Sequence, residues 1–229
     1  MTPPTEVGTQ GWPRWDRDKG PEPRNELPRP CLMLVTDRHL SGGEDELVRA
    51  VGQAVAGGVN VVQVREKDLS TDALSALAGR LREVTRDGAL LMVNGSVDEA
   101  IDSGADGVHL PEDAPMPEER VGLIVGRSVH SVEAAGRAEG EGVDYVVAGP
   151  IYDTRSHPSA TPAGADLIRK ISEVVSVPAI AIGGIDYQRV PDVVRAGAAG
   201  VAVISAILRS SDPGTAAVQL WGALETGSS

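Results

Sequence analysis

The feature that most constrains the fold is a repeated alternation of short apolar runs with longer amphipathic stretches, which begins at Cys31. The short runs are β-branched or aliphatic, as in buried strands, and the stretches between them are rich in alanine and charge, as in helices that cover a sheet. Eight such units can be drawn in a chain of 229 residues. Because a parallel barrel needs about 250 residues, we predict a single (β/α)8 TIM barrel, an α/β fold.

The boundaries follow from the same pattern. The predicted strands are Leu32–Thr36, Val61–Val64, Leu90–Val93, Gly107–Leu110, Leu123–Val125, Tyr145–Ala148, Ala179–Ile182 and Val201–Ile204. The predicted helices include Glu44–Ala56, Thr71–Arg86, Val132–Glu139, Ala165–Val174 and Arg189–Ala196.

A proline-rich segment precedes the barrel. Residues 1–29 combine proline with scattered charge and lack an apolar period, so we expect a disordered or loosely attached extension, with the barrel spanning 30–229. Trp12 and Trp15 leave two alternatives: an ordinary mobile terminus, or a segment that docks on the barrel or on a partner subunit. A homodimer is compatible with the sequence, which does not fix the oligomeric state.

Charge and cysteine content narrow the partners. A net charge of -12 repels nucleic acid, so an anionic ligand must be held by local donors rather than by a basic surface. Cys31 is the single cysteine, which excludes an internal disulfide and favours the cytoplasm, and no apolar run is long enough to span a membrane. We therefore expect a small-molecule partner, with no nucleic acid and no membrane.

Polar and glycine residues follow most of the predicted strands. The active sites of parallel barrels lie at these strand ends, so their loops supply the candidate site. The residues concerned are Asp37, Arg65, Lys67, Asn94, His109, Ser128, His130, the segment 149–157, Gly183, Gly184 and Ser205.

The clearest of these motifs is Gly183-Gly184 after strand seven, together with Ile204-Ser205 after strand eight. Glycine lets backbone amides approach a ligand closely, and barrels often hold a phosphate between these two loops. We predict a phosphate site here, although a pair of glycines also occurs in ordinary tight turns.

Arg65 and Lys67 follow strand two, and strand alternation would turn both to the side of Gln63, where they could meet an anion. The alternative is an inward Arg65 that pairs with Glu66 or Asp37.

Ser128 and His130 follow strand five, where an imidazole could transfer a proton, or His130 could serve only to begin the next helix. The long loop after strand six offers Thr154 and Ser156 as further contacts with a ligand.

Taken in order, these motifs resemble the thiamine phosphate synthase superfamily from about Leu32 to Pro213. The matching runs are residues 34–37, 63–67, Asn94, 107–110, 149–152, the glycine pair and 203–205. The resemblance implies a thiazole phosphate ligand, with its phosphate on the amides of Gly184, Ile204 and Ser205.

Departures from the synthase pattern favour the thiazole tautomerase branch. Synthases bind Mg2+ through two aspartates, at the positions where this chain has Gly95 and Ala114, and His157 replaces a lysine that holds pyrophosphate. The run 126–131 matches the tautomerases, in which its histidine transfers a proton.

We therefore expect a thiazole tautomerase that needs no cofactor or metal. His130 would be catalytic, Arg65, Lys67, Asn94, Ser128, Thr154 and Ser156 would bind substrate, and Gly183, Gly184, Ile204 and Ser205 would bind phosphate. The first alternative is a Mg2+-dependent thiamine phosphate synthase. The second is a non-catalytic protein that binds thiazole phosphate or thiamine phosphate.

Overall fold

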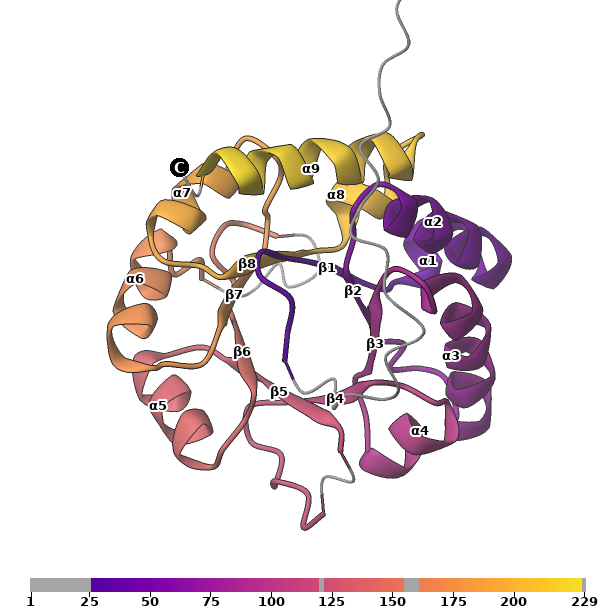
Figure 1. Cartoon of the computed structure of the whole chain (residues 1–229), viewed down its shortest axis with the longest axis horizontal. Coiled ribbons are helices and arrows are strands. Elements are labelled where there is room, and N and C mark those ends of the chain that lie inside the picture. The colour runs from indigo at the N-terminus through magenta and orange to yellow at the C-terminus, as the bar shows by residue number, and fades with distance from the viewer. Residues whose placement is uncertain (1–25, 120–121, 155–160, 228–229) are drawn as a thin grey trace, which may run out of the picture.

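The chain folds into a closed barrel of eight parallel strands, as the sequence predicts (Figure 1). A computed structural model describes residues 26–119, 122–154 and 161–227. The strands are β1 (Cys31–Val35), β2 (Val61–Val64), β3 (Leu90–Val93), β4 (Gly107–Leu110), β5 (Ile124–Val129), β6 (Tyr145–Ala148), β7 (Ala179–Ile182) and β8 (Gly200–Val203). Each strand pairs with the next along the chain, and β8 pairs with β1, so the sheet closes on itself.

Helices surround the barrel (Figure 1). They are α1 (Arg38–Ser41), α2 (Glu44–Ala56), α3 (Thr71–Thr85), α4 (Val97–Asp102), α5 (Val132–Gly140), α6 (Ala165–Val174), α7 (Val190–Arg195), α8 (Ser205–Leu208) and α9 (Pro213–Gly227). The described residues between β4 and β5 form no helix, so a loop covers the barrel there.

The core has two layers, because successive side chains of a strand point to opposite faces. Leu32, Leu34 and the helix residues packed on them form the outer layer, between sheet and helices. Met33, Met92 and Tyr145 belong to the inner layer, which fills the barrel itself. Tyr145 is fully buried in a chain that has no Phe, and it occupies space that only a glycine at position 126 leaves free, since a Cβ there would overlap its ring.

The structure corrects the predicted end of strand five. We expected Leu123–Val125, whereas β5 runs from Ile124 to Val129 and takes in a charged residue. Arg127 is buried on the outer side, where its Nη1 donates to the carbonyls of Glu112 at 2.7 Å and Ala114 at 2.6 Å. These two hydrogen bonds allow a charged side chain to be buried in the strand. The hydrophobic pattern of the sequence alone does not predict such a residue.

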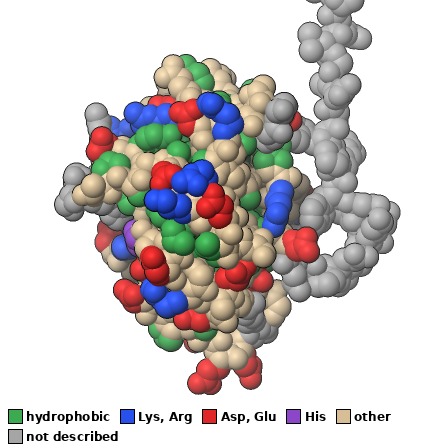
Figure 2. All heavy atoms as spheres, turned by 90° about the vertical axis from the view of Figure 1, so that its left-hand side faces the viewer, with side chains coloured by type: hydrophobic (Ala, Val, Ile, Leu, Met, Phe, Trp, Pro, Cys, Tyr) green, Lys and Arg blue, Asp and Glu red, His purple; other side chains and the backbone are tan. Residues whose placement is uncertain are grey.

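One face of the molecule carries acidic and basic side chains side by side instead of a field of one sign. Figure 2 shows this on the face over α5, α6 and α7, where Asp166 pairs with Lys170 at 2.7 Å and Asp192 pairs with Arg195 at 2.5 Å. No helix among the described residues is long and apolar enough to cross a membrane. Trp12 and Trp15 of the predicted extension lie outside the described residues, whose first buried side chain is Leu27, in the inner layer.

Candidate active site

A cavity of about 210 Å³ opens at the C-terminal ends of the strands. The polar and glycine residues of its wall come from seven of the eight strand ends and the loops after them. They are Gln63, Arg65, Asn94, His109, Ser128, His130, Gly149, Thr154, Gly183, Gly184 and Ser205. The fold therefore brings the strand ends together as predicted, and most of the residues singled out in the sequence line one cavity.

The glycine pair after β7 has the backbone geometry that only glycine adopts without strain. Gly183 and Gly184 have φ angles of 104° and 63°. A Cβ on Gly184 would lie 2.9 Å from that of Tyr152 and would overlap the carbonyl of Asp153. Neither the N–H of Gly184 nor that of Ser205 donates a hydrogen bond to another described residue. Two unused donors in one cavity wall form a local site for an anion.

Arg65 supplies positive charge to the same cavity. It is half-buried, and its guanidinium makes no hydrogen bond or ion pair with any described residue. Burial lowers the pKa of Arg65, and attraction to Asp37 and Glu66 opposes that shift. Its backbone N–H donates to Thr36 Oγ1 at 2.9 Å, which fixes the end of β2 against the end of β1.

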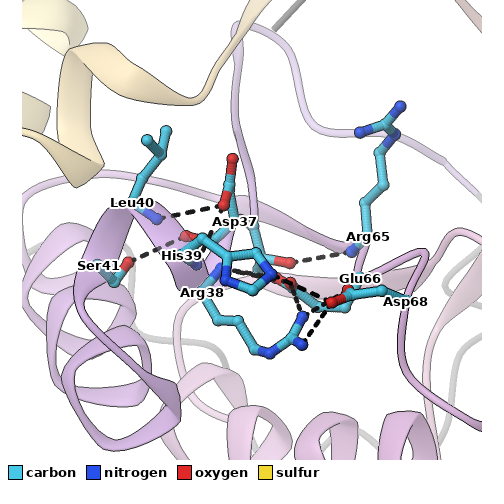
Figure 3. A network of polar contacts seen from close by, with 9 residues as sticks. Asp37, Arg38, His39, Leu40, Ser41, Arg65, Glu66 and Asp68 are labelled. Carbon is cyan, nitrogen blue, oxygen red and sulfur yellow. Dashed lines mark hydrogen bonds and ion pairs between the residues drawn. The ribbon is translucent and has the colours of Figure 1, made fainter.

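The predicted alternative, an ion pair of Arg65 with Glu66 or Asp37, does not form. Glu66 accepts instead from Arg38 Nη1 at 3.1 Å, and Asp37 caps α1 by accepting from the N–H groups of His39 and Leu40. Figure 3 shows the guanidinium of Arg65 turned away from this network.

His109 and Ser128 form a hydrogen-bonded chain with Tyr145. His109 Nε2 lies 2.9 Å from Ser128 Oγ, and its Nδ1 lies 3.1 Å from the Tyr145 hydroxyl. Burial, and then repulsion from Arg65 and Arg127, lower the pKa of His109 to about 3, so its imidazole is neutral at physiological pH. Asn94 donates to the His109 carbonyl at 3.1 Å and so shares this wall of the cavity.

His130 lies at the rim, with its side chain 62% exposed, and is held by Glu112. One carboxylate oxygen of Glu112 lies 2.7 Å from His130 Nδ1 and also accepts from the His130 backbone N–H at 2.7 Å. The sequence analysis missed this partner, because Glu112 belongs to the loop after β4 and no spacing rule connects that loop to the end of β5.

Of the remaining predicted residues, some line the cavity and others do not. Thr154 lines the cavity, whereas Lys67 is exposed and does not line it, since β2 ends at Val64 and strand alternation stops there. Ser156 and His157 lie outside the described residues. Gln63, which the sequence analysis used only to set the direction of its neighbours, is 4% exposed and part of the wall.

A family model described as thiamine monophosphate synthase matches residues 32–207. The chain belongs to this family. It is 43% identical over 189 residues to a putative thiamine-phosphate synthase of Geobacter sulfurreducens, covering 80% of this chain and 88% of the relative. It is 44% identical over 198 residues to a thiamine-phosphate synthase of Methanoculleus marisnigri, covering 82% and 92%.

Solved structures agree with this family. A thiamine phosphate pyrophosphorylase from Pyrococcus furiosus has a TM-score of 0.79 and 36% identity, covering 90% of this chain and 99% of the other. A 3-hexulose-6-phosphate synthase, with a TM-score of 0.65 and 18% identity over 84% of this chain and 99% of the other, shares the fold alone.

These relatives correct the predicted activity. We expected a thiazole tautomerase, an isomerase, with His130 as its proton-transfer residue, but the family members matched over most of the chain carry the name of the synthase, a transferase. The expectation rested on the missing carboxylates at Gly95 and Ala114, on His157 in place of a lysine, and on the match of residues 126–131 to the tautomerases. The absence of these metal-binding carboxylates does not exclude the synthase reaction, because a cationic side chain can also stabilise the charge of a leaving group.

The residues at the metal positions of the family do not fit a divalent ion. A side chain on Gly95 would overlap the Glu99 carboxylate, which accepts from the Ser96 N–H at 2.8 Å and is thereby occupied. Glu112 is occupied by His130, and Ala114 has no side-chain oxygen. Among the described residues, no three His, Cys, Asp or Glu side chains are grouped to hold a metal.

Proposed function

We propose that the chain is a thiamine-phosphate synthase, which joins a hydroxymethylpyrimidine diphosphate to a thiazole phosphate. The observation that carries this proposal is the presence of two separate anion-holding groups in one cavity: the amides of Gly184 and Ser205, and the guanidinium of Arg65. In the barrel order, β1 stands between β8, which Ser205 follows, and β2, which Arg65 follows. A reaction of two phosphate-bearing substrates needs two such places, and the names of the relatives support the same assignment.

In this reaction the bond between the pyrimidine methylene carbon and the diphosphate oxygen breaks, and its electron pair leaves with pyrophosphate. The thiazole ring nitrogen donates its lone pair to that carbon, so no proton moves to or from carbon. The chain must therefore orient two rings and stabilise the charge on the departing group.

We assign the phosphate of the thiazole to Gly183, Gly184, Ile204 and Ser205, and the diphosphate to Arg65. Gln63, Asn94, Ser128 and Thr154 are proposed to contact the rings, because they line the same cavity. His130 loses its predicted role in proton transfer and stays in the proposal as a rim residue that faces the substrates. Because the single cysteine has no second cysteine to pair with, we keep the cytoplasm as the proposed compartment.

The test is to supply both substrates, once with Mg2+ and once with EDTA, and to follow thiamine phosphate and pyrophosphate. We expect both products in equal amounts, and Arg65→Met should lower kcat/KM by about 10- to 100-fold, the effect of losing roughly 1.5–3 kcal/mol from hydrogen bonds to a charged group. Arg49→Met, at an exposed ion pair on α2, is the matched control and should change nothing. Ligand binding without product would overturn the proposal in favour of the non-catalytic alternative.

A further inference from the structure

Arg65 stands beside carboxylates that could disable it. Asp37, Glu66 and Asp68 all lie in the loops that follow β1 and β2, and the chain as a whole carries a net charge of -12. A half-buried guanidinium without a partner gains by pairing with a nearby carboxylate. Arg65 nevertheless pairs with none of them, so something else must satisfy these acids.

Each of the three carboxylates is already bound (Figure 3). Asp37 caps α1. Glu66, with its side chain 2% exposed, accepts from the backbone N–H of Arg38 at 3.1 Å and from its Nη1 at 3.1 Å. Asp68 takes both terminal nitrogens of the Arg38 guanidinium at 2.6 Å and the His39 Nε2 at 3.1 Å.

Arg38 is the donor shared by two of these acids, and its loss would affect them unequally. Asp68 is 54% exposed, so water and His39 would still satisfy it. Glu66 is almost completely buried and would keep a single donor, the backbone N–H of residue 38, for a charged group. A buried carboxylate short of donors carries a large desolvation cost and attracts a cation within reach. Burial lowers the pKa of the adjacent residue, Arg65, and the charge of Glu66 opposes that shift, so Arg65 is the cation expected to turn toward Glu66.

We propose that Arg38 is a positioning residue, which occupies Glu66 and thereby leaves the Arg65 guanidinium available for an anionic group of the substrate. This inference rests on the proposed function, in which Arg65 holds the diphosphate. It adds a residue that does not line the cavity and acts only through its neighbours. In an acidic protein, a cation is useful for binding only if the acids around it have other partners.

The test measures binding of inorganic pyrophosphate by titration calorimetry, together with KM for the pyrimidine diphosphate and kcat. Arg38→Met should weaken pyrophosphate binding and raise KM by about 10-fold, the order expected for one hydrogen bond to a charged group, with little change in kcat at saturation. Glu66→Gln alone should stay near the wild type. The double variant Arg38→Met with Glu66→Gln should recover binding to within about twofold, because no buried carboxylate is left to recruit Arg65.

Two comparisons make the result specific. Arg38→Met with Asp68→Asn removes the same charge but leaves Glu66, so it should bind as poorly as Arg38→Met alone. Recovery in both double variants would reduce the effect to net charge and would overturn the inference. Recovery in neither, or no loss in Arg38→Met, would overturn it as well. Failure of Arg65→Met to weaken pyrophosphate binding would instead refute the proposed role of Arg65, and hence that part of the proposed function.

Discussion

His109 should make the fold sensitive to acid by an amount that can be worked out. Its pKa is about 3 in the folded chain, and an exposed histidine titrates near 6.5. Above pH 6.5 the imidazole is neutral in both states. Between these two values the unfolded chain binds a proton that the folded chain does not, so stability falls as the pH falls. At about 1.4 kcal/mol for each pKa unit, the loss is about 2 kcal/mol at pH 5 and approaches about 5 kcal/mol below pH 3.

The measurement is the free energy of unfolding in urea at pH 7 and pH 5, for the wild type and for His109→Gln. Gln keeps an amide that can meet Tyr145 and Ser128 but does not titrate. The wild type should lose about 2 kcal/mol more than the variant between the two pH values, whatever their difference at pH 7. Equal losses in the wild type and His109→Gln would refute the reasoning.

Two pairs of glycine substitutions separate packing from backbone preference. Gly184→Ala should abolish binding of inorganic phosphate, measured by calorimetry, because its Cβ would displace the neighbouring loop. Gly104→Ala has a similar φ of 64° and nothing within 4 Å of its Cβ, so phosphate binding should be unchanged and the free energy of urea unfolding should fall by only about 1 kcal/mol. Gly126→Ala should lower the free energy of unfolding by about 3 kcal/mol or more, because its Cβ would overlap the Tyr145 ring, whereas Gly136→Ala in α5, with open space around it, should raise it by about 0.5–1 kcal/mol. Intact phosphate binding in the first variant, or equal stability of the two alanines in the second pair, would contradict these readings.

The sequence predicts the barrel and its glycine loop because both depend on local patterns. Largely apolar runs of four residues predict the exact bounds of β2, β3, β4, β6 and β7, and the glycines at 183 and 184 indicate a backbone conformation that other residues avoid.

Contacts between loops are beyond such patterns. The partner of His130 is a carboxylate 18 positions earlier, and the partner of Glu66 is an arginine 28 positions earlier. Lys67 failed to reach the cavity because a strand rule was applied beyond the strand. The choice between synthase and tautomerase was wrong for a different reason: it was drawn from departures at a few loop positions and from the match of residues 126–131, whereas the relatives matched over most of the chain are named synthases.

The pairing of β8 with β1 also affects how the protein behaves in solution. An open sheet presents amides at its outermost strands, onto which another chain can add a strand and start aggregation. A sheet that closes on itself offers no such template, even though its strands are rich in valine and isoleucine. The hazard is therefore confined to the interval before the last strand docks, and conditions that slow this step should promote precipitation during refolding, while the finished barrel should tolerate high concentration.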